Sequence, residues 1–212
     1  MRLPEDTYAI VPNQTIVQEL DLNDSDNYLG ATDLTAFVEK YHLNPNPGHF
    51  NFREIFGTQN EADAYYNTPR TWYGQKLFNP EIEQQPSAQD MPMFRQPSKK
   101  IAIEDVQFFL SSHYNGTPYD PFGTFASGDE REQKRYRSIA MDRNQCSSIL
   151  QIRNDVPAAQ AAIQWVAMGF FAYAPYVPFF TNINDTPLDY RNTTATVAVD
   201  NVYWLSKTLS VL

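Results

Sequence analysis

The chain has 212 residues, of which 42% are hydrophobic and 14% aromatic, and its formal net charge is -9 at neutral pH. This supply of apolar side chains suits one ordinary domain with a core, or part of a larger one. The acidic balance leaves no large basic surface to neutralise phosphates, which argues against nucleic acid and anionic membranes as partners.

No signal-peptide core follows Met1, and the longest apolar run, Val166–Phe180, contains two prolines and is too short to cross a bilayer. A single cysteine, Cys146, excludes an internal disulfide framework and a zinc site built from cysteines. Together these features predict a cytoplasmic protein.

The first half of the chain predicts two extended segments that meet at a turn, followed by helices. Extended segments at Tyr8–Val11 and Thr15–Leu20 flank the turn formers Pro12, Asn13 and Gln14. Helical spacing predicts a helix over residues 33–41, capped by Thr32 or Asp33, a short helix at Phe52–Phe56, and a third helix with Thr68 as its cap and Pro69 in its first turn. Residues 79–100 contain four prolines and no periodicity, which is typical of a long surface loop.

Arg70 is out of place by its local sequence. It lies in the first turn of the third predicted helix, where the macrodipole disfavours a cation. Its presence there therefore needs another reason.

The central block predicts a helix packed on a sheet. Apolar residues at three- and four-residue steps predict a helix over 101–113, which Asn115-Gly116 would end, and Thr117-Pro118 and Asp120-Pro121 would then form a rigid elbow. A hydrophilic bridge over 127–135 leads to strands Tyr136–Met141 and Cys146–Arg153, a buried strand at Ile163–Phe171, an extended segment at Pro175–Asp189, and a last helix capped by Asp200. The fold class is α+β, and the abrupt ends of the pattern indicate part of a larger architecture.

Few residues could perform chemistry unaided. Cys146 is a possible nucleophile with His113 as its base, although a lone cysteine at the start of a strand is more often a small core residue. His42 and His49 lack the spacing of metal ligands. Asp120, between Tyr119 and a proline, is better explained as a turn residue than as an acid or base.

Five longer sequence segments, in the same order along the chain, resemble the later half of PepD-type bacterial dipeptidases. They are NTPRTWYGQKLFNP (Asn67–Pro80), VQFFLSSHY (Val106–Tyr114), GTPYDP (Gly116–Pro121), YRSI (Tyr136–Ile139) and TNINDTP (Thr181–Pro187). The resemblance covers nearly the whole chain. It implies an N-terminal-nucleophile hydrolase with an αββα sandwich of antiparallel sheets flanked by helices, a dipeptide substrate and no cofactor.

In such enzymes a cysteine at the mature N-terminus attacks the peptide carbonyl, and its own α-amine serves as the base. Here Met1 is followed by Arg2, and Cys146 lies deep in the chain where the family's nucleophile does not fall. The resemblance thus implies that residues 1–212 are the carboxyl-side portion of a single dipeptidase domain, without the nucleophile.

Two residues match the family's site by position. Asn13 corresponds to an oxyanion donor that follows a central strand, and Arg70 corresponds to an arginine near the nucleophile. An Asx turn for Asn13 and a surface or carboxylate-paired role for Arg70 are the structural alternatives.

Three functions therefore compete. The chain is part of a cysteine dipeptidase that needs its amino-terminal portion, with homo-oligomers also possible; or a non-catalytic subunit that pairs an open sheet edge with another chain; or a thiol enzyme that uses Cys146 with His113.

Overall fold

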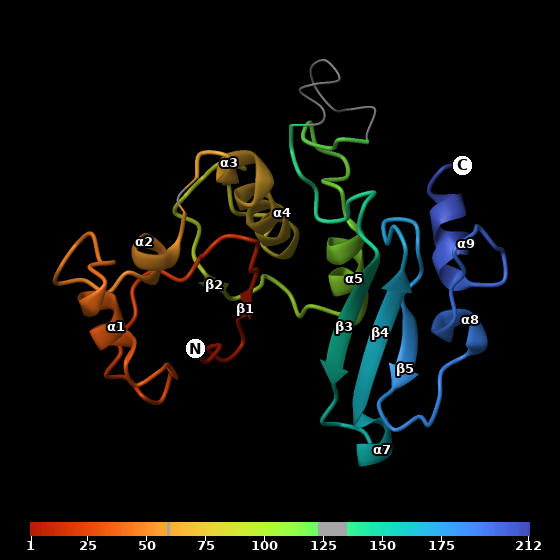
Figure 1. Ribbon diagram of the computed structural model, residues 1–212, viewed down its shortest axis with the longest axis horizontal. Coiled ribbons are helices and arrows are strands. Elements are labelled where there is room, and N and C mark those ends of the chain that lie inside the picture. The colour runs from red at the N-terminus through yellow and green to blue at the C-terminus, as the bar shows by residue number, and fades with distance from the viewer. Residues whose placement is uncertain (59, 123–134) are drawn as a thin grey trace. The chain divides into compact units, whose positions relative to one another are not determined.

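The computed structural model describes residues 1–58, 60–122 and 135–212 (Figure 1). The chain forms two compact units, and the predicted single domain over 1–212 stays a prediction. Unit 1 comprises residues 1–101 and 135–137, and unit 2 comprises residues 102–122 and 138–212. Both units mix helices with antiparallel strands, so the α+β class is confirmed.

Unit 1 is mostly helical. Its elements are β1 (Tyr8–Ala9), α1 (Leu34–Lys40), α2 (Phe52–Phe56), α3 (Asp63–Tyr66), α4 (Thr68–Phe78) and β2 (Phe94–Arg95). The prediction of α2 is confirmed residue for residue, and α1 matches to within two residues at each end. The N-cap of α4 is Asn67 rather than the predicted Thr68, which is already helical.

Of the two predicted extended segments, Tyr8–Val11 contains β1, and it does not pair with Thr15–Leu20. β1 pairs instead with β2, through Tyr8 with Arg95 and Ala9 with Phe94, and the 15–20 segment makes one isolated bridge, Glu19 with Asn51. Pro12 cannot donate to a ladder, and a distant strand competes for the edge of β1.

The predicted surface loop over 79–100 contains β2 and is bound to α4. Trp72 Nε1 donates to the Gln84 carbonyl at 2.9 Å, and Gln75 Nε2 donates to the Pro92 carbonyl at 2.7 Å. Polar side chains of α4, which sequence reasoning would place toward water, therefore supply the bonds that hold an irregular segment in place.

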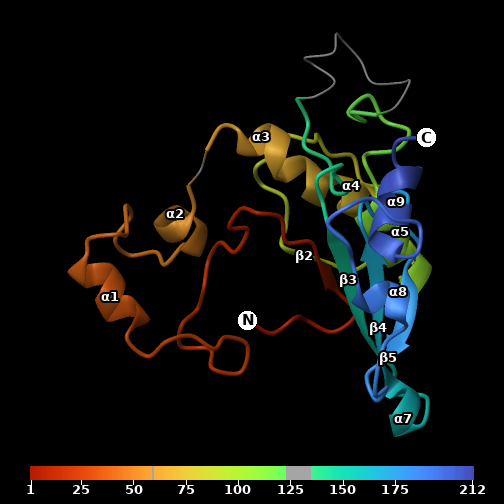
Figure 2. The ribbon, with the colours of Figure 1, turned by 45° about the vertical axis from the view of Figure 1, so that its right-hand side comes forward.

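Unit 2 is built on a three-stranded antiparallel sheet in the order β3-β4-β5 (Figures 1 and 2). The strands are β3 (Cys146–Ile152), β4 (Ala162–Met168) and β5 (Val177–Phe180), and the helices are α5 (Ile103–Ser111), α7 (Ala158–Ala161), α8 (Leu188–Arg191) and α9 (Val202–Leu209). Figure 1 shows β4 between its two neighbours, with β3 as an outer strand.

The predicted strand Tyr136–Met141 is wrong, while its expected partner is confirmed as β3. Ser138 Oγ donates to the Ala140 carbonyl at 2.6 Å, and the Ala140 amide donates to the Ser112 carbonyl at 2.9 Å. These bonds occupy groups that a ladder would require, and β3 pairs instead with β4. The hydrophilic bridge over 127–135 falls, apart from Arg135, outside the described residues.

The core of unit 2 lies where β4 runs into an aromatic turn. Ala167 and Ala140 are fully buried and contact Phe170 and Phe171. The last helix begins one residue later than predicted, because Asn201 rather than Asp200 is the cap and its Oδ1 accepts from the Trp204 amide at 3.0 Å. None of the described helices is long and apolar enough to cross a membrane.

Gly169 provides a test of this packing. Its φ is +80°, and an added Cβ would lie 2.8 Å from Ser206 Cβ in α9. We expect Gly169→Ala to lower the free energy of unfolding by about 2–4 kcal/mol, since it adds backbone strain to a clash.

Gly116→Ala is the matched control. Gly116 has a φ of +73° but open space around its Cβ position, so about 1–2 kcal/mol is expected from strain alone. Urea denaturation of both variants measures the difference, and equal losses would contradict the packing of β4 against α9.

Candidate active site

Asn13 and Arg70, predicted from the sequence as site residues, contact each other in unit 1. Arg70 Nη1 donates to Asn13 Oδ1 at 2.8 Å across 57 residues of chain. The arginine is only 9% exposed, whereas Asn13 is an exposed residue. A buried cation thus holds one end of an exposed amide.

The turn that carries Asn13 is anchored on both sides. Ile10 and Ile16 are each 7% exposed and fix the chain before and after the turn. Within the turn, Gln14 Nε2 donates to Thr68 Oγ1 at 3.2 Å, which ties the turn to the first residue of α4. Both Asn13 and Gln14 therefore bond to the same end of this helix.

Arg70 is also oriented by a short series of side-chain hydrogen bonds. Its Nη1 also lies 3.4 Å from Asn67 Oδ1, and Asn67 Nδ2 donates to Asp63 Oδ1 at 2.6 Å. Asp63 is 8% exposed, so a buried carboxylate stands at the far end of this series. These acceptors explain how a cation is tolerated in the first turn of α4, which contains no acidic residue.

Two buried polar atoms near this helix end have no hydrogen-bond partner among the described residues. They are Gln14 Oε1 and Thr71 Oγ1. Buried polar groups are usually satisfied, and unsatisfied ones mark bound water or a functional site. Neither residue was predicted as a site residue; Gln14 lies in a predicted turn and Thr71 on the buried helix α4.

The far end of α4 is fixed by a second polar cluster around Asn79, which is 4% exposed. Its Nδ2 donates to the Gln96 carbonyl at 2.9 Å, and its Oδ1 accepts from the Tyr8 hydroxyl at 2.7 Å. Burial raises the pKa of Tyr8 to about 12; Arg95 opposes this effect and Glu81 adds to it. The helix is thereby attached to both β1 and the 79–100 segment.

His113 and Asp120 form a pair of their own in unit 2. His113 Nδ1 lies 2.6 Å from Asp120 Oδ1, and the His113 ring meets the edge of Phe122 at 5.5 Å between centroids. Asp120 Oδ1 also accepts from the Phe122 amide at 2.9 Å, which agrees with its predicted role as a turn residue. The pair stabilises the elbow that follows α5.

This elbow forms differently from the prediction. Tyr114 and Gly116 have φ values of +71° and +73°, and Asn115 acts through its side chain, whose Oδ1 accepts from the Ser112 hydroxyl and the His113 amide. Cys146 is a free, exposed cysteine at the start of β3. Within the described ranges, none of the recorded contacts of His113 involves Cys146, so this structure gives the Cys146–His113 hypothesis no support.

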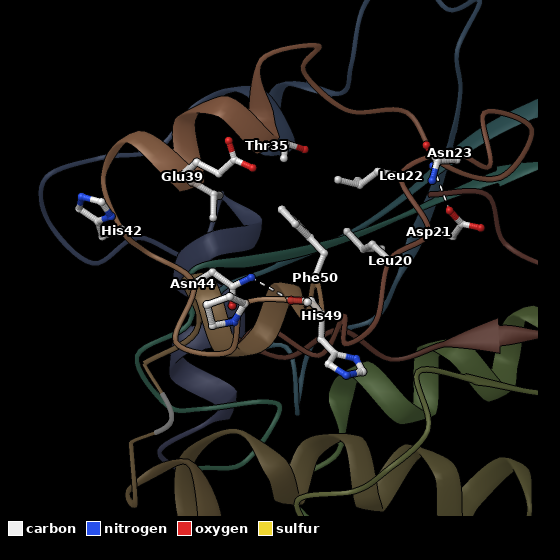
Figure 3. A pocket seen from close by; sticks show the side chains of 13 residues that line it. Leu20, Asp21, Leu22, Asn23, Thr35, Glu39, His42, Asn44, His49 and Phe50 are labelled. Atoms are coloured by element: carbon white, nitrogen blue, oxygen red, sulfur yellow. Dashed lines mark hydrogen bonds between the residues drawn. The ribbon is translucent and has the colours of Figure 1, made fainter.

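A pocket of about 670 Å³ lies elsewhere in unit 1, between residues 20–23 and 35–50. Figure 3 shows Leu20, Leu22 and Phe50 gathered at its centre, with Asp21 and Glu39 toward its sides and the His42 ring turned outward. In the described part of the chain, no group of three His, Cys, Asp or Glu could hold a metal ion. The pocket contains neither Asn13 nor Arg70, and it offers no arranged nucleophile.

The chain matches a protein family over its whole length. The model for peptidase family C69 matches residues 1–212. The chain belongs to peptidase family C69.

Three similar proteins carry dipeptidase names. The chain is 45% identical over 211 residues to a probable dipeptidase of Latilactobacillus sakei, 43% over 217 residues to probable dipeptidase B of Lactococcus lactis, and 40% over 206 residues to dipeptidase A of Lactobacillus helveticus. These alignments cover 97–100% of this chain but only 43–45% of the relatives. The chain thus spans less than half the length of the curated relatives it matches.

The Tyr8–Asn79 bond leads to a prediction about alkaline stability. Because the folded pKa of Tyr8 is about 12 and the ordinary value is 10.0, the unfolded chain loses this proton first as the pH rises. The contribution of protonated Tyr8 to the free energy of unfolding is fully present below pH 10 and is lost as the pH approaches 12.

We therefore expect the free energy of unfolding to fall more steeply between pH 10 and pH 12 in the wild type than in Tyr8→Phe. Urea denaturation at several pH values measures both slopes. Tyr41→Phe, at an exposed tyrosine of unit 1, is the control and should keep the wild-type slope.

Proposed function

We propose that this chain is the carboxyl-side portion of a cysteine-type dipeptidase and that Asn13 supplies a hydrogen-bond donor to the oxyanion of the reaction. Membership of family C69 and the dipeptidase names of the relatives support the activity. The observation that carries the residue assignment is the 2.8 Å bond from Arg70 to Asn13.

The bond matters because an amide side chain has a donor end and an acceptor end. Arg70 occupies the oxygen of Asn13, so the Nδ2 group with its two N–H donors is directed to the other side. No described residue accepts a hydrogen bond from Asn13 Nδ2, and the residue is exposed. A donor fixed in advance and aimed at free space is what an oxyanion site requires.

Arg70 contributes charge as well as orientation. Its guanidinium stays ionised, and its burial within the first turn of α4 weakens screening by water. The guanidinium is hydrogen-bonded to the Asn13 side chain, so its positive charge favours negative charge on a substrate oxygen that is bound by Asn13 Nδ2. In this proposal Asn13 is the catalytic residue, and Arg70 is the positioning residue that acts through it.

The nucleophile would come from the portion of the enzyme that this chain does not contain. A cysteine thiolate attacks the carbonyl carbon of the dipeptide, and its α-amine, having taken the thiol proton, protonates the leaving amine. Water then hydrolyses the thioester through a second oxyanion and releases the amino-terminal residue of the dipeptide as a free amino acid. Both oxyanions would accept from Asn13 Nδ2.

The remaining proposals concern architecture and partners. We infer that residues 1–212 belong to one dipeptidase domain and that the β3-β4-β5 sheet is part of an αββα sandwich, an inference supported by the family match and the antiparallel pairing. The substrate is a dipeptide, and the partner is the missing amino-terminal portion or a homo-oligomer. The free thiol of Cys146 suits the reducing cytoplasm.

Reconstitution tests the activity. The chain is co-expressed with the part of the Latilactobacillus sakei relative that it does not match, and hydrolysis of Ala-Ala is followed by chromatography. We expect turnover from the complex and none from the 212-residue chain alone. Thiol-dependent turnover by the chain alone, or an inactive complex, would overturn the proposal.

The same complex tests Asn13. Asn13→Asp keeps an oxygen for Arg70 but replaces both N–H donors, so we expect kcat to fall about 100-fold to 1,000-fold, with Asn13→Ala similar. Asn192→Ala, at an exposed asparagine whose side chain bonds to none of the described residues, is the control and should keep full activity. Unchanged turnover in Asn13→Asp would remove this residue from the site.

A further inference from the structure

We propose that the open edge of β3 is the docking site for an extended segment of the dipeptidase portion that this chain lacks. The inference rests on the proposed function and deepens it by naming the surface through which the two portions join. It starts from the hydrogen-bond register of the sheet in unit 2.

The register fixes which backbone groups of β3 are already used. The Gly169 amide donates to the Gln145 carbonyl at 2.7 Å, and the Arg153 amide donates to the Ala161 carbonyl at 2.8 Å. Because hydrogen-bonded pairs alternate along an antiparallel ladder, the odd-numbered residues of β3 direct their N–H and C=O groups to β4. The even-numbered residues direct theirs away from it.

These even-numbered residues are also the exposed ones. They are Cys146, Ser148, Leu150 and Ile152. Leu150 and Ile152 are 75% and 79% exposed, high values for apolar residues on neighbouring positions of one face. Within the part of the chain that the structure describes, no strand lies beyond β3. The edge thus combines unused backbone groups with uncovered apolar side chains.

The other edge of the same sheet is protected. The Thr181 amide donates to the Ala162 carbonyl at 3.2 Å, and with the register of β4 and β5 this directs the backbone of residue 178 outward. Residue 178 is a proline and has no N–H to offer. Edge strands are commonly protected by proline or charge, and β3 has neither in its sequence CSSILQI. An unprotected edge is expected where another strand belongs.

The occupant follows from the lengths of the relatives. The chain is matched over 97–100% of its residues, while 55–57% of each relative lies outside the alignment. A second copy of this chain is the competing occupant, and it makes a different prediction because the chain alone would then dimerise through β3.

The test uses the 212-residue chain, tagged and co-expressed with the unmatched part of the Latilactobacillus sakei relative. The double variant Leu150→Lys/Ile152→Lys places charge on two exposed positions whose backbone groups do not bond to β4. We expect capture of the partner to fall about tenfold or more, because lysine on an edge strand opposes pairing. Val199→Lys/Val211→Lys, at residues of unit 2 that are 76% and 84% exposed, is the matched control and should capture normally.

Hydrogen exchange reports on the same edge without a substitution. In the captured complex, the amides of Ser148, Leu150 and Ile152 should become protected relative to the chain alone. Equal capture by the β3 double variant, no capture by the wild type, or unprotected β3 amides would overturn the inference. So would a dimer of the chain alone that the β3 substitutions dissociate.

Failure of the inference and failure of the proposed function give different results. Capture that depends on β3 but yields no hydrolysis of Ala-Ala would overturn the dipeptidase proposal and leave the docking surface in place. Hydrolysis of Ala-Ala that persists in the β3 double variant would overturn the docking surface and leave the dipeptidase proposal in place.

Discussion

The bond between Arg70 and Asn13 is the constraint on which the candidate site depends. A guanidinium that is nine-tenths buried at the start of a helix is electrostatically unfavourable unless oxygen atoms surround it. Asn13 and Asn67 provide those atoms, and Asp63 orients Asn67 in turn. The bond to Asn13 therefore contributes both to the stability of the buried arginine and to the orientation of the amide.

This requirement extends along α4. The Asn13 amide keeps its orientation only if α4, which carries Arg70, is itself held in place. Nearly all residues of α4 are buried, which restricts its movement. Its polar side chains bind the irregular 79–100 segment, with Gln75 accepting from Arg95 Nε at 2.8 Å while donating to the Pro92 carbonyl. The segment resembles a loop in sequence but acts as a support for the helix. A site on an exposed turn is in this way held by a buried and almost fully bonded scaffold.

The sequence predicted the parts of this arrangement that are local. Period and caps gave α1, α2, α5 and α9 to within a few residues, and Arg70 was recognisable because its charge disagreed with its position in the helix. Pairing over long distances was not predictable. β1 pairs with β2, with Tyr8 opposite Arg95 and Ala9 opposite Phe94, and nothing in Thr15–Leu20 distinguishes an unpaired extended segment from a strand. The strand expected at Tyr136–Met141 failed for a related reason, since the Ala140 amide donates to the Ser112 carbonyl instead of to a neighbouring strand.

The Asn13–Arg70 contact was predicted as two separate residues from the resemblance, and the bond between them came from the structure. Gln14 and Thr71, whose buried oxygens lack partners among the described residues, were not predictable, because a polar residue reveals its lack of a partner only in three dimensions. Motif comparison finds residues whose identity matters, and geometry finds those whose surroundings are unusual.

Two independent features of the chain are incomplete in the same sense. The candidate site offers an oriented amide and a positive charge, and no cysteine lies among the described residues of unit 1. The sheet of unit 2 offers four outward residues of β3 without the proline that protects β5. The first deficit is chemical and the second is one of backbone pairing, and neither implies the other. A single additional portion, carrying a cysteine and an extended segment, would satisfy both, and the relatives have the length to contain it.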